Sequence, residues 1–247
     1  MLPRVAIVFA KVPELGKVKT RLLGRLTVEE AAEVHRACLE DTVRQVARVP
    51  GCRKSLCVAG GLDQAKRLAA ALKLDGRWHV SVQRGRDLGA RMWEALEAFF
   101  RGGCGRVVIV GTDTPWMGNE RILLAFELLH TADVVLGPCS DGGYYLVGAR
   151  SLAPAVFRDI PWGTSQVLDR TIGALEKSGL SFRLLPRDFD LDRPEDLARA
   201  AALLRTGEAR APALARLMKK LKLGSVSRSS RRRAPARRSR TRRPGRA

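Results

Sequence analysis

An aspartate stands at the end of an apolar run in VVIVGTDTPWMG (107–118). The run predicts a buried strand, so Asp113 lies where that strand ends, and Pro115 restricts Thr114 to extended geometry. At this edge of a parallel sheet a lone carboxylate suits Mg²⁺ or Mn²⁺, hard ions that share their oxygen ligands with substrate phosphates. The alternative is that Asp113 caps a helix that begins near Gly118, or only shapes a turn.

Basic residues gather in FAKVPELGKVKTRL (9–22), directly after the first apolar run. Glycine permits close backbone approach, and several cations there would neutralise a diphosphate. The candidate phosphate-binding residues are Lys11, Gly16, Lys17, Lys19 and Arg21. A solvated basic loop is the alternative. The segment has neither the G-x-x-x-x-G-K-[ST] nor the G-x-G-x-x-G pattern, so it indicates neither a P-loop nor a dinucleotide fold.

A second group of acids lies in RDFDLDRPEDL (187–197), where Pro194 suits the first turn of a helix. Asp192 has an ordinary alternative as the N-cap of that helix. Asp190 cannot be explained by the same cap. We therefore expect Asp190 and Asp192 to complete a metal site with Asp113.

The segment GPCSDGGYYLVGAR (137–150) combines a turn with an aromatic pair. Asp141 could orient an acceptor hydroxyl or act as a general base, although Asp-Gly-Gly is also a turn signal between two strands. Tyr144 and Tyr145 alternate along a strand, so one is expected to face the site and the other the core.

A further acceptor-side segment is IPWGTSQVL (160–168), which joins a turn to a helix start at Thr164 or Ser165. Trp162 on this loop could stack on a sugar or pack under a lid, and both alternatives stay open. With Tyr144, we take Trp162 and Thr164 as candidate residues on the acceptor side of the site.

Cysteine and histidine chemistry has little support in this chain. The five cysteines are scattered and complete no zinc pattern, which is typical of reduced thiols in a cytoplasmic protein. His35, His79 and His130 have unrelated contexts, and no serine or cysteine has the setting of a nucleophile. The beginning of the chain lacks a signal-peptide layout, and no apolar run is long enough for a transmembrane segment. We therefore expect a cytoplasmic protein.

Short apolar strands that alternate with helices must position these residues. Strands are predicted at 5–10, 55–59, 79–82, 107–110, 133–136, 144–147 and 182–185. Helical spacing of apolar residues recurs at 62–72, 88–100 and 120–129, and Thr27 with Glu30 forms a capping box before a helix that runs to about Arg48. This alternation predicts an α/β fold with a mostly parallel sheet flanked by helices, and it brings the candidate segments to the carboxyl edge.

The net charge of +20 comes mostly from the C-terminal part. Residues 219–247 hold three lysines and ten arginines without an acid, which leaves +7 for the remainder. We expect an α/β domain over residues 1–207, a basic amphipathic helix over 208–223 that packs on this domain, and a disordered Arg-rich tail over 224–247. The tail could bind polyanions non-specifically, but it lacks aromatic residues for stacking on bases.

Taken in order, these segments resemble a bacterial family of GT-A-like nucleotide-dependent transferases, named glycosyltransferases, some of them linked to arsenosugar biosynthesis. The resemblance covers roughly residues 4–205 and rests on FAKVPELGKVKTRL, QRGRDLGARM (83–92), VGTDTP, GPCSDGGYYLVG, IPWGTS and DFDLDRPEDL. It implies the fold of the nucleotide-diphospho-sugar transferases, a nucleotide-linked donor and a divalent cation.

The resemblance also implies roles for individual residues. By position, Asp113 corresponds to the metal-binding acid and Asp192 to a second acid, Lys17, Lys19 and Arg21 to the phosphate-binding loop, and Asp87 and Arg91 to a base or ribose pocket. The sequence departs from the family pattern at Gly111-Thr112-Asp113, where sugar-transferring relatives usually have Asp-x-Asp. A lone Asp before x-Pro is closer to nucleotidyltransferases such as phospholactate guanylyltransferase, whose Gly-Gly-rich loop is absent here.

The leading hypothesis is a metal-dependent glycosyltransferase that moves a sugar from a nucleotide-sugar to a small-molecule acceptor. The alternative keeps the same site but takes an NTP, transfers a nucleotidyl group and releases pyrophosphate. A second alternative is a polyanion-binding protein that acts through the Arg-rich tail.

Overall fold

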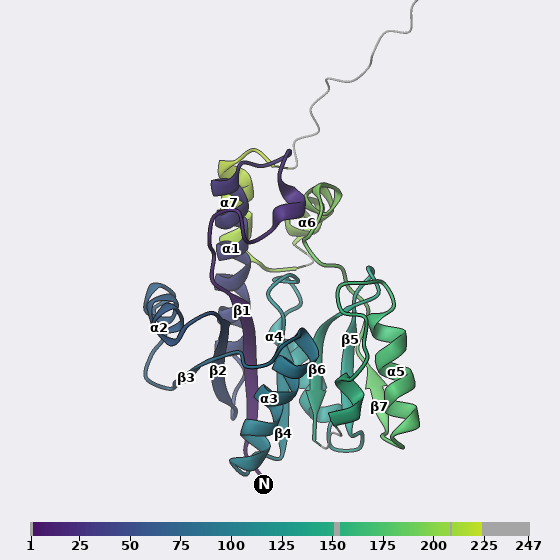
Figure 1. Cartoon of the computed structure of the whole chain (residues 1–247). Helices are drawn as coiled ribbons and strands as arrows, with labels where there is room; N and C mark the ends of the chain where they lie inside the picture. The colour runs from purple at the N-terminus through teal and green to yellow at the C-terminus, as the bar shows by residue number, and fades with distance from the viewer. Residues whose placement is uncertain (1, 151–153, 208, 224–247) are drawn as a thin grey trace, which may run out of the picture.

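The computed structural model describes residues 2–150, 154–207 and 209–223, and its centre is a seven-stranded sheet (Figure 1). The strands lie in the order β3-β2-β1-β4-β6-β5-β7, and β6 alone runs antiparallel to its neighbours. Their bounds are β1 Arg4–Lys11, β2 Arg53–Ala59, β3 Trp78–Val82, β4 Arg106–Val110, β5 Val134–Pro138, β6 Tyr144–Ala149 and β7 Phe182–Leu184. The predicted mostly parallel α/β fold is confirmed, and each predicted strand is present.

Helices cover both faces of the sheet because successive residues of its strands point to opposite sides. Along β1, Val5 and Ile7 pack in one apolar cluster, whereas Ala6 and Val8 pack in the other. The first face carries α3 (Leu88–Arg101), α5 (Val167–Lys177) and the short 3₁₀ helix η2 (Pro154–Phe157). The second face carries α1 (Val28–Ala47), α2 (Leu62–Ala71) and α4 (Asn119–Leu128).

A third apolar cluster lies beyond the carboxyl edge of the sheet, where Figure 1 shows α6 and α7 beside the upper part of α1. It joins α1 to η1 (Thr20–Leu22), α6 (Pro194–Thr206) and α7 (Pro212–Lys220). The buried carboxylate of Asp41 on α1 accepts hydrogen bonds from the backbone N–H groups of Ala213 and Leu214, at 3.0 and 2.9 Å. The basic amphipathic helix is therefore capped by and packed on the domain that precedes it.

Local signals explain several of the observed boundaries. The capping box predicted at Thr27 and Glu30 is present at the start of α1, and Pro194 occupies the first turn of α6. The Asp-Gly-Gly turn joins β5 to the antiparallel β6. Among the described residues, no helix has the length and apolar character needed to cross a membrane. The predicted tail, residues 224–247, lies outside the described residues, and the domain boundaries stay a prediction.

Candidate active site

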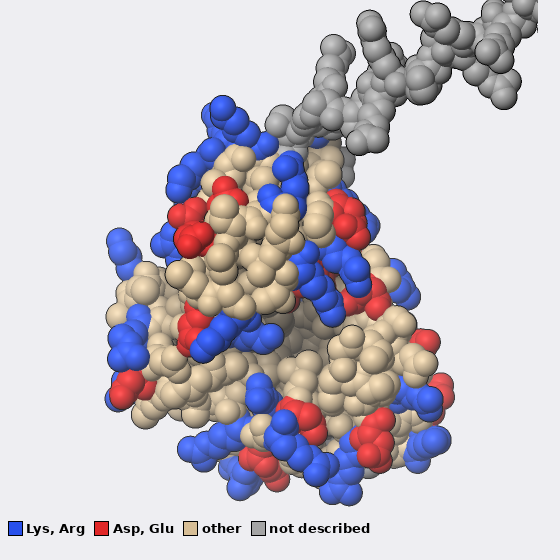
Figure 2. Space-filling model, turned by 45° about the horizontal axis from the view of Figure 1, so that its top comes forward, with Lys and Arg blue, Asp and Glu red and all other residues tan. Residues whose placement is uncertain are grey.

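A cavity of about 490 Å³ opens at the carboxyl edge of the sheet. Figure 2 shows a hollow near the middle of the face that carries this edge, with Lys and Arg side chains on its margins. Most of the predicted site residues line the cavity: Lys11, Lys19, Arg21, Arg91, Asp113, Asp141, Tyr144, Trp162, Thr164, Asp190 and Asp192. Segments that are far apart in the sequence thus meet at one place, with cations from the loop after β1 opposite acids from the loops after β4 and β7.

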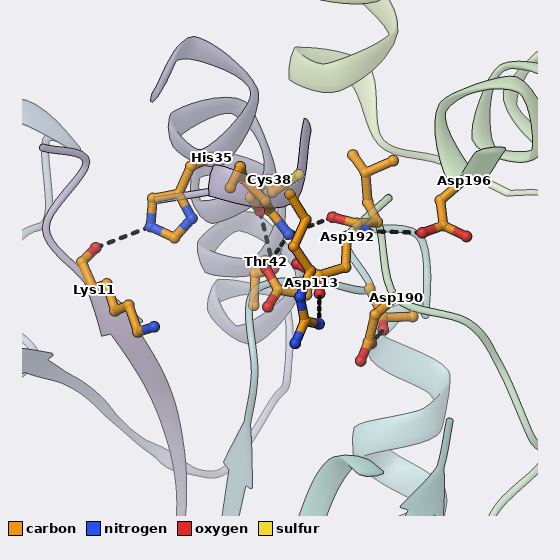
Figure 3. Close-up of polar contacts among 12 residues, drawn as sticks. Lys11, His35, Cys38, Thr42, Asp113, Asp190, Asp192 and Asp196 are labelled. Atoms are coloured by element: carbon orange, nitrogen blue, oxygen red, sulfur yellow. Dashed lines mark hydrogen bonds and ion pairs between the residues drawn. The ribbon is translucent and has the colours of Figure 1, made fainter. Parts of the chain in front are cut away.

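An ion pair between Lys19 and Asp113 forms the centre of this arrangement. Figure 3 shows Asp113 near Asp190 and Asp192. The Lys19 ammonium lies 2.5 Å from Asp113 Oδ1 and also donates to the carbonyl oxygen of Leu191. Lys19 is buried and its backbone φ is +50°, a left-handed conformation that is uncommon for a residue with a side chain. Since such strain persists only when the surrounding structure holds it, the loop after β1 is shaped to bring this ammonium to Asp113.

The pair shifts both groups toward their charged forms. Burial is the largest single effect and would lower the pKa of Lys19, but the charge and hydrogen bond of Asp113, together with the charges of Cys38 and Asp192, outweigh it and the pKa is raised. Burial would likewise raise the pKa of Asp113, but the charge of Lys19 and its hydrogen bond lower it. The Asp113 side chain is 45% exposed, although it lies deep in the protein, because it faces the cavity. A ligand in the cavity therefore meets an ionised carboxylate and, behind it, an ionised ammonium.

Asp113 does not cap the following helix, contrary to the alternative considered above. Helix α4 begins after Gly118 and has no side-chain cap. The backbone of Asp113 instead binds the segment after β7: its carbonyl accepts from the N–H of Leu191 at 2.8 Å, and Thr114 Oγ1 donates to Asp190 Oδ1 at 2.7 Å. These bonds hold the two acid-bearing segments together.

Asp192 does not cap the helix that follows it either. Arg193 is the N-cap of α6, and Asp196 accepts from the N–H groups of both Asp192 and Arg193. The Asp192 carboxylate is 2.5 Å from the guanidinium of Arg21 instead. Each of the two acids that the family resemblance assigns to the metal ion is thus paired with a basic residue that follows β1, Asp113 with Lys19 and Asp192 with Arg21.

The candidate donor group among the described residues is Cys139, Asp141 and Asp190, whose ligand atoms lie within 4.8 Å of one another. It shares Asp190 with the predicted set of Asp113, Asp190 and Asp192, but it includes neither Asp113 nor Asp192. Cys139 Sγ donates to Asp190 Oδ1 at 3.0 Å. Burial and the charge of Asp190 raise the pKa of this thiol far above its usual range, so it stays protonated. The candidate ligands are therefore the carboxylate oxygens of Asp141 and Asp190, and oxygen ligands are those that Mg²⁺ and Mn²⁺ prefer.

Charge in this region also fits a divalent cation. Burial, followed by the charge of Asp113, raises the pKa of Asp190 to about 6. The smaller part of this shift, from the charges of Asp113 and Asp141, reflects carboxylates gathered in one place, whose repulsion a bound cation would relieve. Asp190 was predicted from the sequence and Cys139 was not, although its position two residues before Asp141 placed it in a segment already of interest.

The raised pKa of Asp190 gives a prediction for the metal-free protein. Its folded-state pKa of about 6 exceeds the usual 3.8, so its contribution to stability is complete below about pH 4 and is lost as the pH rises through about 6. Asp190→Asn keeps an acceptor for Thr114 and removes the charge. We expect the variant and the wild type to have the same free energy of unfolding near pH 4. Near pH 7 we expect the variant to be the more stable protein, with a free energy of unfolding about 1–3 kcal/mol higher.

Urea denaturation in the presence of a chelator, repeated across this pH range, measures the difference. A stability difference that does not change with pH would contradict the assignment.

Two residues of the predicted phosphate loop do not line the cavity. Lys17 is exposed and lies 2.6 Å from Glu14, and Gly16, with φ +71°, forms the turn beside it. His35, which the sequence did not single out, does line the cavity: its Nε2 donates to the carbonyl of Lys11 at 3.1 Å (Figure 3). A histidine within a regular helical pattern gives no sequence signal of this contact.

The predicted base or ribose residues differ in their placement. Asp87 is the N-cap of α3, and its Oδ1 accepts from the N–H of Ala90 at 2.8 Å, which accounts for an aspartate at this position. It is not among the described residues that line the cavity. Arg91 does line the cavity, and its Nε donates to the carbonyl of Gly85 at 3.1 Å.

The predicted acceptor side is built from two loops that are locked together. Gly142 has φ +88°, its carbonyl accepts from the N–H of Leu168, and an added Cβ would lie 2.0 Å from the carbonyl oxygen of Ser165. The turn thus requires glycine because the loop before α5 packs directly on it. Asp141 Oδ1 accepts from the N–H of Gly143 at 2.9 Å, so the carboxylate also shapes the turn, as the alternative interpretation held.

Aromatic rings form the wall of this side. Tyr144 and Trp162 meet edge to face, with ring centroids 6.4 Å apart, and Trp162 also lies beside Phe157. Tyr145 points to the other face, where its hydroxyl donates to the carbonyl of Pro186. Trp162 packs closely over Gly89, since a Cβ there would be 2.7 Å from its ring. This packing fixes Trp162 in its position at the cavity.

Comparisons with known proteins agree with this fold. Residues 42–164 match a family model described as "Uncharacterized protein conserved in bacteria (DUF2064)". The chain resembles a "putative nucleotide-diphospho-sugar transferase" from Desulfovibrio desulfuricans G20 with a TM-score of 0.81 and 32% identity, over 90% of this chain and 97% of that one. A search of curated proteins found no match.

More distant structures share the fold alone. A 4-diphosphocytidyl-2C-methyl-D-erythritol synthase from Anaerococcus prevotii DSM 20548 has a TM-score of 0.56 and 17% identity, over 83% of this chain and 96% of that one. A cytidylyltransferase from Leptospira borgpetersenii serovar Hardjo-bovis (strain JB197) has a TM-score of 0.51 and 14% identity, over 90% and 96%.

Proposed function

Because the chain belongs to the DUF2064 family and shares 32% identity with the Desulfovibrio protein over nearly its whole length, we propose that it is a nucleotide-dependent transferase. More specifically, we propose a glycosyltransferase that moves a sugar from a nucleotide-sugar to a small-molecule acceptor. The observation that carries this proposal is the convergence of Lys19 and Arg21 with Asp113, Asp190 and Asp192 in one cavity at the carboxyl edge.

The donor side of the cavity suits a diphosphate. Its described cations are Lys11, Lys19, Arg21 and Arg91, and they come from the loop after β1 and from α3. Fixed cations stabilise the charge that develops on a leaving diphosphate, without reorganisation during the reaction. Arg21 and Lys19 now pair with acids, and exchange of these partners for phosphate oxygens would accompany donor binding.

Asp113, Asp190 and Asp141 are the residues that would hold Mg²⁺ or Mn²⁺, with Asp192 as a further acid close by. A divalent cation there would neutralise the diphosphate and make it a better leaving group. Asp141 also lies toward the acceptor, and the carboxylate oxygen that is not bonded to Gly143 is available to receive a proton from an attacking hydroxyl.

The acceptor side favours glycosyl over nucleotidyl transfer. Segments 141–147 and 162–167 form this side, and their lining residues include Asp141, Tyr144, Trp162 and Thr164, with no lysine or arginine among them. A phosphate acceptor would find no basic side chain on these segments to bind it. An uncharged acceptor with hydroxyl groups and an apolar face fits these residues, because aromatic rings pack against the C–H faces of such molecules and carboxylates accept from their hydroxyls.

Nucleotidyl transfer remains the second candidate, and the observation that favours it is the pattern Gly111-Thr112-Asp113 in place of Asp-x-Asp. The two reactions release different products. With Mn²⁺ and nucleotide-sugars, glycosyl transfer to a panel of hydroxyl acceptors should release nucleoside diphosphate only when an acceptor is present. With NTPs and phosphate-ester acceptors, nucleotidyl transfer should release pyrophosphate.

We expect release of nucleoside diphosphate that depends on the acceptor and stops when a chelator removes the metal ion. Release of pyrophosphate from an NTP would instead show nucleotidyl transfer. If truncation of the tail abolished function while the Asp113→Ala variant kept it, polyanion binding through the tail would be supported.

A further inference from the structure

A second groove, of about 920 Å³, lies on the other side of the segments that carry the candidate active-site acids. It is bounded by the end of α1, the start of α4, the C-terminal half of α6 and the segment that leads to α7. None of its described lining residues lines the active-site cavity. The reaction proposed above therefore does not account for it.

The groove is strongly basic. Five arginines line it, against two acids, Glu120 and Asp188. Asp188 is already neutralised, since it lies 3.0 Å from the guanidinium of Arg121 and accepts from Trp116 Nε1 at 3.0 Å. The other four arginines are Arg48, Arg187, Arg199 and Arg210, and all four are exposed. Arginines gathered around a hollow from α1, α6 and two connecting segments repel one another unless an anion lies between them.

An aromatic pair forms the wall of the groove. The rings of Trp116 and Phe189 are 4.5 Å apart at an angle of 33°, and the guanidinium of Arg199 lies 3.8 Å from the centre of the Phe189 ring. A guanidinium stacked on a ring keeps its N–H edge free and fixed in direction, which suits bidentate binding of a phosphate.

We propose that this groove is a second binding site, for a small molecule that carries a phosphate or diphosphate group. Arg48 and Arg199 would hold the anion from opposite walls, and the Trp116–Phe189 pair would support the uncharged part of the ligand. The volume lies within the range of about 300–1,000 Å³ that is usual for small-molecule sites.

The placement of the groove connects it to the active site. Trp116 lies two residues after Thr114, and the Thr114 hydroxyl donates a hydrogen bond to Asp190. Phe189 directly precedes Asp190 in the chain. A ligand in the groove would thus contact the reverse side of the two segments that hold Asp113 and Asp190. Binding itself needs neither the donor nor the cation, so it can be tested independently of the proposed reaction.

Inorganic pyrophosphate at physiological salt is the probe, and tryptophan fluorescence of the metal-free full chain is the readout. A Trp162→Phe background removes the tryptophan at the active-site cavity and leaves Trp116 beside the groove. We expect a saturable change in fluorescence that Trp116→Phe abolishes. The double variant Arg48→Ser/Arg199→Ser should weaken this binding at least tenfold, since each lost guanidinium removes charge-assisted hydrogen bonds.

The matched control is Lys66→Ser/Arg67→Ser, which removes the same charge from exposed positions on α2, at the far edge of the sheet. It should bind as tightly as the parent. If the control weakened pyrophosphate binding equally, overall charge would account for the attraction and the proposal would be overturned. Unchanged pyrophosphate binding in the Arg48→Ser/Arg199→Ser variant would overturn it as well. Circular dichroism and thermal unfolding check that each variant is folded.

Discussion

Asp113→Asn is expected to lower turnover of the nucleotide-sugar donor about 10²–10³-fold, which is the usual effect of removing one preorganised electrostatic group from a reaction centre. The substitution keeps the shape of the side chain and removes the charge that would bind the cation. It also takes the opposing charge away from the buried Lys19 ammonium, 2.5 Å away, which keeps only neutral oxygen acceptors in the amide of residue 113 and the Leu191 carbonyl. The expected loss is in turnover, with a smaller change in donor affinity, because the basic loop stays in place.

Two measurements make this prediction specific. Calorimetric titration with Mn²⁺, in the absence of any substrate, should show at least tenfold weaker binding in Asp113→Asn, whereas Asp169→Asn, an exposed acid in the first turn of α5, should leave both affinity and turnover unchanged. A fully active Asp113→Asn protein with normal Mn²⁺ affinity would remove the basis for the proposed metal site.

Lys19→Met is expected to lower turnover about 10²-fold and to destabilise the protein by about 1–3 kcal/mol. Methionine has a similar length but leaves Asp113 and Asp192 without the ammonium that now interacts with both. The cost falls below that of a fully buried broken pair because Asp113 faces the cavity, where water can solvate it.

The loop itself supplies the control for this substitution. Lys17→Met removes a lysine two residues away that is exposed and paired with Glu14, so we expect turnover within about twofold of the wild type. Added Mn²⁺ should raise the melting temperature of Lys19→Met more than that of the wild type, because the cation replaces the missing charge. The reverse order, with Lys17→Met inactive and Lys19→Met active, would show that the exposed lysine is the phosphate ligand.

Local signals in the sequence were sufficient for the elements of this fold. A strand such as Val107–Val110 is fully apolar because a parallel strand is buried on both faces, and the capping box at Thr27 and Glu30 acts within a single turn. Since parallel strands end at a common edge, the order of strands and loops also indicated where a ligand would bind and which segments would meet there.

The roles of individual polar side chains depended on partners far away in the chain. Lys17 and Lys19 are equivalent in the sequence, yet only Lys19 reaches Asp113, 94 residues away, because the loop takes a left-handed turn at that residue. Asp87 and Asp192 both precede helices, but one caps its helix and the other pairs with Arg21. His35 contacts the site without any local signal in the sequence, and Cys139 had only its position near Asp141 to indicate it.

The sequence by itself thus determined the α/β fold, the edge at which the site forms and the kind of charge on each loop, because periodicity, capping and turn chemistry act over a few neighbouring residues. Only the tertiary structure decided which cation faces which acid and which aspartate has a raised pKa. It also revealed the arginine-lined groove behind Asp190, whose walls come from α1, α4 and α6. Coulomb energy and desolvation depend on distances in space, and residues from five separate segments acquire those distances only when the chain is folded.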